Sequence, residues 1–365
     1  MREPVALCQG APRRGCGSPV SASPLPPSAP ASGDNARSGP ASTPPRELER
    51  KLIDSVVAKL DVARLPGMPI IIDRALRASR RERDASQLCE WLALDPSLTF
   101  RVFEATSGPD LARAARDELS LAQRVGAMKP ELVRPLLMSA ARSSLGPDSS
   151  TLSARELGEF WIHALRVAFL SRTLAEACSY RNPDEAYLAG LLHDLGSFAL
   201  LATVPNTLRS LVATQANAPW GAIPEHAGRL GTIHAQIGAA LLEKLRVPFY
   251  ISDAVLLHHA PSVELEGTHP LVRILCCAEV LAHSRSPAVP HAAIADLLQT
   301  PASAVSAAEK AAAEKVSQLG ILWKRRSHIA ATSRRRPRIE KRWNSSEIIW
   351  MIPFLLDFDQ SYPGY

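Results

Sequence analysis

This sequence predicts an all-α fold, and three observations support that expectation. Alanine, leucine and arginine dominate the 365 residues, whereas aromatic residues make up only 5%. Such a composition favours helices over strands. Apolar residues recur at helical spacing along most of the chain, and no segment shows the apolar–polar alternation that is typical of a strand. With 46% hydrophobic residues, the chain is able to bury a substantial core.

Residues 1–45 differ from the rest of the chain. They contain ten prolines and few large apolar side chains. Such a segment cannot bury enough surface to offset the entropy lost on ordering, so we expect it to be disordered. The N-terminus lacks the apolar segment of a signal peptide.

The next block, residues 46–150, predicts the first helical half of a domain. The LPGMP sequence at 65–69 is a turn. In the 84–106 tract, Asp84 could cap one helix and Asp95–Pro96 begins a second, because proline is tolerated in the first helical turn. The helical tracts expected in this block are 46–65, 70–79, 84–106 (two helices), 119–128 and 129–144.

Residues 151–285 predict a second helical half. Its first helix could be capped by Ser153, with Glu156 three residues later completing a capping box. The helices expected here are 153–180, 183–204 (one helix), 234–247, 248–260 and 269–284. In the C-terminal extension, 286–365, residues 289–321 are compatible with helix, and the remainder continues no pattern and is expected to be poorly ordered.

The positive charge of the chain is concentrated in a basic tail. Residues 324–342 carry nine Lys or Arg and one acidic residue, a net charge of +8, against a formal +6 for the whole chain. The rest of the chain therefore carries −2 and has no polyanion-binding character of its own. The tail could bind nucleic acid or anionic lipid, but a solvated tail is the favoured interpretation.

The sequence also bears on location. It has no run of about 18 apolar residues, the length that a membrane-spanning helix needs. Six cysteines include no CxxC pair, and several lie in apolar helical tracts, so buried free thiols in a reducing cytoplasm are expected.

Six of the ten histidines fall between residues 163 and 259, within or beside expected helices. They are His163, His193, His226, His234, His258 and His259, and Asp194 directly follows His193. Histidines placed one per helix on apolar faces suggest a bundle that directs ligands inward. Neutral imidazoles and a carboxylate suit divalent iron, manganese, zinc or nickel. Two such ions could activate a bridging water toward phosphorus.

A simpler alternative remains for each histidine alone, since a single helical histidine is more often a hydrogen-bonded core residue than a ligand. The spacing is not that of an HExxH zinc site. On a continuous helix, His193 and Asp194 lie about 100° apart, so both reach one site only near its inner face. Their number and the two doublets favour a cluster.

The motifs together resemble a known family. GLLHDLG (190–196), preceded by WIHAL and followed by HAQIGAALLEKLRVP and then HH, is similar to the HD superfamily of metal-dependent phosphohydrolases. The tracts LPGMPIIIDRAL, LALDPSLTFRVFEATSG and LAQRVGAMKPELVRPLLM resemble its HDOD branch. The resemblance spans roughly residues 60–285. It implies a regulatory module of bacterial signal transduction, whose catalytic relatives, the HD-GYP phosphodiesterases, hydrolyse cyclic di-GMP.

The resemblance also implies a set of metal ligands. It matches His163, the doublet His193–Asp194, His234, and the pair His258–His259 to the family's ligand positions. Glu279 stands where the family has an aspartate, one methylene longer. The implied cofactor is a divalent metal such as iron or manganese.

Three departures weaken an enzymatic interpretation. Ser197 replaces the lysine that commonly follows the HDxG motif in active relatives, no GYP element follows the His258–His259 pair, and Thr106–Ser107 replaces the usual Asn-Ser. P-loop, GxGxxG and GxSxG motifs are absent from the sequence.

Two functions follow. The favoured one is a non-catalytic HDOD module that binds a signalling protein or second messenger in trans. The alternative is a metal-dependent phosphodiesterase acting on a cyclic dinucleotide or nucleotide.

Overall fold

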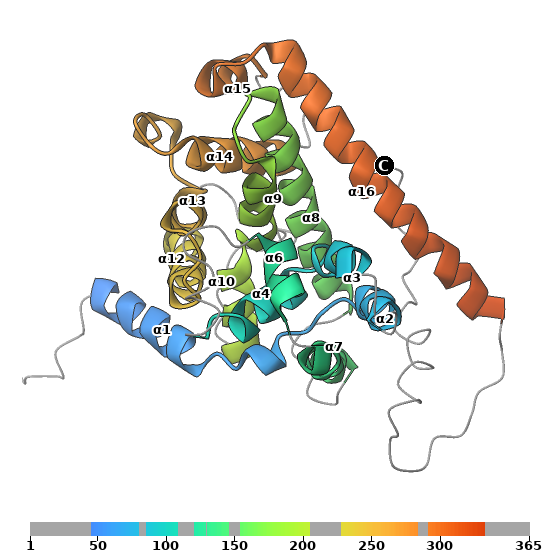
Figure 1. Cartoon of the computed structure of the whole chain (residues 1–365). Coiled ribbons are helices and arrows are strands. Elements are labelled where there is room, and N and C mark those ends of the chain that lie inside the picture. Colours follow the sequence, from blue (N-terminus) through green and yellow to red (C-terminus); the bar gives the residue numbers. More distant parts are fainter. Residues whose placement is uncertain are drawn as a thin grey trace, which may run out of the picture. The chain divides into compact units, whose positions relative to one another are not determined.

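Helices form every regular element of the residues that the structure describes, so the predicted all-α fold is confirmed. The computed structural model describes residues 45–79, 85–108, 120–128, 130–145, 154–204, 228–283 and 291–332. Nearly all of the segment expected to be disordered, 1–45, lies outside these ranges, as do residues 333–365 of the tail. Figure 1 shows the helices in chain order.

The first half of the chain contributes short helices around a turn. They are α1 (Pro45–Lys59), the 3-10 turn η1 (Val62–Arg64), α2 (Pro69–Ala78), α3 (Ala85–Leu92), α4 (Pro96–Ala105), α6 (Leu121–Ala127) and α7 (Pro130–Leu145). The second half contributes α8 (Ala154–Ala177), α9 (Pro183–Leu192), α10 (Leu195–Thr203), α12 (Gly228–Lys244), α13 (Phe249–Leu257), η3 (Ser262–Glu264), α14 (Pro270–His283), α15 (His291–Leu298) and α16 (Ala302–Thr332).

Asp95 begins α4 as the sequence predicted. Its Oδ1 accepts a hydrogen bond from the backbone N–H of Leu98 at 2.9 Å, and its Oδ2 accepts one from Met68 at 2.5 Å. Only 1% of Asp95 is exposed. One carboxylate therefore caps α4 and fixes the 65–69 turn. The caps expected at Asp84 and Ser153 lie outside the described residues.

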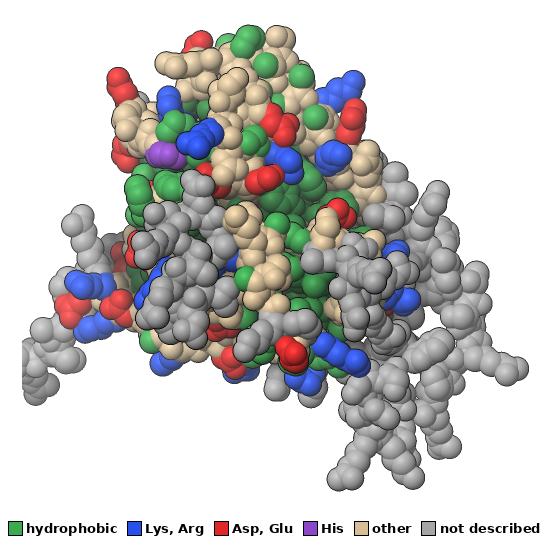
Figure 2. All heavy atoms as spheres, viewed as in Figure 1, with side chains coloured by type: hydrophobic (Ala, Val, Ile, Leu, Met, Phe, Trp, Pro, Cys, Tyr) green, Lys and Arg blue, Asp and Glu red, His purple; other side chains and the backbone are tan. Residues whose placement is uncertain are grey.

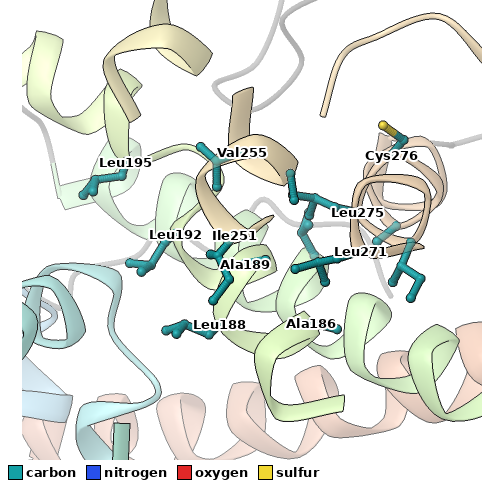
Figure 3. Close-up of a cluster of buried hydrophobic side chains, with 14 of the residues drawn as sticks. Ala186, Leu188, Ala189, Leu192, Leu195, Ile251, Val255, Leu271, Leu275 and Cys276 are labelled. Carbon is teal, nitrogen blue, oxygen red and sulfur yellow. The ribbon is translucent and has the colours of Figure 1, made fainter. Parts of the chain in front are cut away.

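The core consists of two hydrophobic clusters that share α4, α8 and α9. One gathers mainly side chains from α2 to α7, and the other gathers side chains from α1, from α4 and from the helices from α8 onward. Leu191 belongs to the first cluster and Leu192 to the second, although both lie on α9. Figure 3 shows part of the second cluster, where α9 meets α13 and α14. Both clusters therefore contain side chains from before and from after residue 150, where the sequence divides the domain into two halves.

The C-terminal extension contributes to the same core. Val305, Ala308 and Ala312 of α16 are buried in the second cluster, and α16 runs beside α8 (Figure 1). The Thr300 hydroxyl, just before α16, donates to the carbonyl of Ala177 at the end of α8 at 2.9 Å. α16 continues to Thr332, beyond the tract ending at residue 321 that the sequence marks as compatible with helix.

The tract 183–204 is not the single helix that the sequence predicted. It forms α9 and α10, which are separated at His193 and Asp194. Asp194 has φ −97° and ψ 14°, outside the regular helical range. Apolar residues continue on both sides of the break, so periodicity alone could not locate it. Because the helix is interrupted here, the side chains of His193 and Asp194 are not constrained to point about 100° apart, as they would be on a continuous helix.

Gly196 brings α10 against α12. A Cβ atom at this position would lie 1.9 Å from the carbonyl oxygen of His234 and 2.8 Å from the backbone nitrogen of Gly238. Only glycine permits this approach. Gly196 therefore sets the distance between Asp194, at the start of α10, and His234 on α12.

One stretch of the described residues, Pro183–Thr203, is long and apolar enough to cross a membrane, but 83% of its most apolar window is buried inside the protein. On the face that Figure 2 shows, acidic and basic side chains are interspersed among hydrophobic ones. Among the described cysteines, Cys276 and Cys277 are buried free thiols, and Cys89 and Cys178 are free and partly buried.

We expect Asp95→Ala to lower the free energy of unfolding by about 2 kcal/mol or more, because two buried N–H groups lose their acceptor. Urea denaturation measures this. Asp61 provides a matched control, since it caps the exposed turn η1 through Ala63. Asp61→Ala should cost about 1 kcal/mol or less. Equal costs for the two substitutions would contradict the bridging role of Asp95.

We expect Gly196→Ala to lower the free energy of unfolding by about 3 kcal/mol or more, because its methyl group would overlap the backbone of α12. Gly126 in α6 is the control, because an added Cβ there meets no atom within 4 Å. Gly126→Ala should be neutral or stabilise by about 0.5–1 kcal/mol. A thermal melt of Gly196→Ala like that of the wild type would show that α10 and α12 are not held at this distance.

Candidate metal centre

The structure brings all seven predicted ligand residues into one buried cluster. Their donor atoms fall into three overlapping groups, and within each group all lie within 4.8 Å of one another. The contributing residues are His163 on α8, His193 and Asp194 at the α9–α10 break, His234 on α12, His258 and His259 after α13, and Glu279 on α14. His226, a further candidate, lies outside the described residues. That the seven residues bind metal stays a prediction.

One end of the cluster joins α8, α9 and α14. The Nε2 atoms of His163 and His193 are 3.1 Å apart. Oε2 of Glu279 lies 3.5 Å from Nε2 of His163 and 3.3 Å from Nε2 of His193. Two imidazoles and one carboxylate thus converge from three helices.

The other end joins α12 to the end of α13. The Nε2 atoms of His234 and His258 are 3.1 Å apart. The ring of His259 lies with its centroid 4.0 Å from that of His258 and 5.0 Å from that of His234. This end holds three imidazoles.

Asp194 lies between the two ends. Its Oδ1 is 3.2 Å from Nε2 of His234, at one end. Its Oδ2 is 3.6 Å from Nε2 of His193 and 3.8 Å from Nε2 of His163, at the other. Each oxygen of one carboxylate therefore faces a different group of histidines.

Backbone carbonyls determine which ring nitrogens carry hydrogen. Nδ1 of His193 lies 2.7 Å from the carbonyl oxygen of Gly190, and Nδ1 of His258 lies 2.6 Å from that of Val255. A carbonyl only accepts, so both Nδ1 atoms donate, and the neutral rings present lone pairs at Nε2. This is the arrangement in which histidine binds metal, because the outer nitrogen fixes the ring while the inner one remains free.

Burial keeps several of these imidazoles neutral. It lowers the pKa of His193, and it lowers that of His258 well below its usual value. Burial, together with neighbouring His234, lowers the pKa of His259 to about 4. For His163 burial also acts against protonation, but the charge of Glu279 outweighs it and the pKa is raised. At neutral pH His193, His258 and His259 therefore offer unprotonated nitrogens.

The two carboxylates remain charged. Burial acts to raise their pKa values, but the surrounding histidines outweigh it and hold the pKa of Asp194 and of Glu279 below the usual range. Oε2 of Glu279 is fully buried and accepts no hydrogen bond. Buried charges that lack such partners are costly unless they are paired or coordinate a metal. The donor set and this unsatisfied oxygen both fit a divalent cation.

The departures from the active family pattern have local explanations. Ser197 is buried, and its hydroxyl donates to Oδ1 of Asp194 at 3.4 Å, a long contact. Thr106 Oγ1 accepts a hydrogen bond from Arg124 at 3.1 Å. Ser107 Oγ donates to the carbonyl of Leu245 at 3.0 Å. Thr106 and Ser107 thus link the end of α4 to α6 and to the end of α12.

His283 is a functional candidate that sequence reasoning missed. Its Nε2 lies 2.6 Å from Oε1 of Glu279. The signal was its position four residues after Glu279 on one helix, a spacing that places two side chains on the same face. This spacing is common on helices, and no family position matches His283, so the sequence alone does not single it out.

Comparisons with known proteins agree with this architecture. The model of the HDOD domain family matches residues 65–261. An uncharacterized protein of Treponema pallidum (strain Nichols) is 26% identical over 250 residues, which cover 65% of this chain and 46% of that protein. The chain thus spans about half the length of the curated relative that it matches.

Two solved structures share the fold. One is the MmoQ response regulator of Methylococcus capsulatus str. Bath, with 21% identity and a TM-score of 0.54 over 67% of this chain and 97% of that chain. The other is a fragment (20–298) of the same regulator, with 23% identity and a TM-score of 0.51 over 65% of this chain and 92% of that chain. At these identities the likeness concerns the fold. Because the family model covers more than half of the chain, this protein belongs to the HDOD domain family.

Proposed function

We propose that this protein is a regulatory HDOD module of signal transduction that holds divalent metal in its histidine–carboxylate cluster. It acts on a signalling protein or responds to a second messenger in trans, in the cytoplasm. Family membership supports the signalling role, as does the shared fold with a protein described as a response regulator. Because the chain spans about half the length of its curated relative, this proposal concerns the present chain and does not extend to that relative's full length.

The observation that carries the metal proposal is the inward orientation of lone pairs on His193 and His258. Each ring is fixed by a backbone carbonyl, and each free Nε2 faces a second imidazole nitrogen at 3.1 Å. Iron or manganese suits this set of imidazoles and carboxylates. At one end of the cluster His163, His193 and Glu279 would hold the metal. At the other end the remaining histidines would do so, and Asp194 faces both ends.

The environment of Asp194 favours regulation over catalysis. Where active relatives carry a lysine, Ser197 is buried and directs its hydroxyl toward Asp194. A hydroxyl supplies no positive charge to a phosphate group. The metal-bound cluster would then stabilise the packing of α8, α9, α12, α13 and α14. The outer surface of the helices would bind the signalling protein or second messenger.

A phosphohydrolase remains the second candidate because the ligand set is complete at both ends of the cluster. A bound divalent ion lowers the pKa of water and stabilises charge on phosphoryl oxygens. In that case the substrate would be a cyclic dinucleotide or another nucleotide. Asp194 and Glu279 would orient the site, and the buried helices would exclude bulk water.

The first test is metal content. Protein purified from cells should carry about one or two equivalents of iron or manganese, measured by plasma mass spectrometry. His193→Ala should reduce this to traces while helical circular dichroism is retained. His291→Ala is the control, because His291 hydrogen-bonds to Glu309 away from the cluster. Metal-free wild-type protein that cannot be loaded with either ion would rule out the metal proposal.

The second test separates regulation from catalysis. We expect metal-loaded protein to leave cyclic di-GMP intact, as judged by chromatography, because the site lacks the lysine of active relatives. The phosphohydrolase candidate predicts turnover that disappears in His193→Ala and persists in His291→Ala. That outcome would replace the regulatory proposal.

A further inference from the structure

The Glu279 carboxylate divides its two oxygens between different partners. Oε2 faces Nε2 of His163 and of His193 inside the cluster. Oε1 accepts a hydrogen bond from Nε2 of His283 at 2.6 Å. The side chain of Glu279 is 6% exposed and that of His283 is 28% exposed. His283 therefore lies at the rim of the cluster and holds the outer oxygen of a buried carboxylate.

Helix geometry makes this contact possible. Residues 279 and 283 are separated by one turn of α14, so their side chains share a face. The ring of His283 also lies with its centroid 4.8 Å from that of His163, on α8. His283, on α14, therefore packs against His163 of α8, and its Nε2 is directed at Glu279.

The hydrogen bond assigns His283 a role other than that of a ligand. The carboxylate of Glu279 is ionised and only accepts, so Nε2 of His283 carries the hydrogen. Because Nε2 donates in this way it has no lone pair for a metal, and His283 belongs to none of the groups of potential ligands found among the described residues. The Oε2 atom, by contrast, is buried without a hydrogen bond and faces the imidazoles. Only the inner oxygen is available to a cation.

A glutamate has one more rotatable bond than an aspartate, so its carboxylate has more orientations to lose when it is fixed. A hydrogen bond to the outer oxygen removes part of that freedom before any ion binds. Partners of this kind commonly change metal affinity by about 10–100-fold.

We propose that His283 is a positioning residue of the metal centre, which fixes Oε1 of Glu279 so that Oε2 is aimed at a divalent cation. This inference rests on the proposal that the cluster binds metal. It assigns to a residue beyond the matched family segment the task of restraining the longer carboxylate of this chain.

The test is titration of metal-free, full-length protein with Co²⁺, followed by calorimetry and by visible absorption. His283→Ala should weaken Co²⁺ binding by about 10–100-fold. At saturating Co²⁺ its absorption bands should match those of the wild type, because no ligand has been removed. His283→Gln should restore much of the affinity, since its amide can donate to the same oxygen.

Two further variants sharpen the comparison. His291→Ala removes a similar His–Glu hydrogen bond, 2.9 Å long, between α15 and α16, and should leave Co²⁺ affinity unchanged. In a Glu279→Asp background, where the additional methylene is gone, His283→Ala should weaken Co²⁺ binding by a smaller factor than in the wild type. The same factor in both backgrounds would overturn the inference.

The other outcomes are distinguishable. Wild-type protein that binds no Co²⁺ would overturn both the metal proposal and this inference. Tight Co²⁺ binding by both the wild type and His283→Ala would overturn the inference alone. Altered absorption bands in His283→Ala would show that His283 is itself a ligand, which also overturns the positioning role.

Discussion

The site depends on one electrostatic constraint, which is that two nitrogen lone pairs cannot face each other at 3.1 Å without a hydrogen or a cation between them. The pairs His163–His193 and His234–His258 both meet this condition. In each pair the carbonyl-bound ring accepts and its partner donates, so a proton lies between them. A metal cation satisfies the same constraint and also neutralises the two carboxylates. Proton and metal are therefore competing occupants of one position.

That constraint explains several features of the helical scaffold. The break between α9 and α10 lets consecutive residues, His193 and Asp194, direct their side chains into the same cluster. Gly196 then allows α12 to approach closely enough for His234 to lie 3.2 Å from Asp194. The hydrophobic residues around α9 hold these backbones in place (Figure 3). A local departure from helical regularity thus serves the convergence of the polar groups.

Much of this architecture could be predicted from the sequence. Apolar periodicity located most helices, and Asp95–Pro96 identified the start of α4, because caps and periodicity are local properties. The number and placement of the histidines predicted that they converge with Asp194, and the family resemblance added Glu279 to the set. The α9–α10 break could not be predicted in this way, since apolar residues continue through it and the departure depends on packing against α12. The continuation of α16 past residue 321 was missed because the charged sequence there lacks an apolar stripe.

His283 illustrates a different limit. A histidine four residues after a carboxylate is common on helices, and only the coordinates show that it meets Glu279 on the side away from His193. Sequence comparison alone gives it no weight, because the family match ends at residue 261. The proposed metal centre thus includes residues, Glu279 and His283, that lie outside the matched segment.

The second hydrophobic cluster has a consequence for where this protein begins and ends as a folding unit. Val56 of α1 and Val305, Ala308 and Ala312 of α16 are buried in the same cluster as α9. A fragment cut at the limits of family similarity would expose apolar surface at both ends and would omit Glu279. Similarity between sequences marks the shared ancestry of a segment. The closure of buried surface marks the folding unit, and here buried residues from Val56 to Ala312 extend it beyond both ends of the matched segment 65–261.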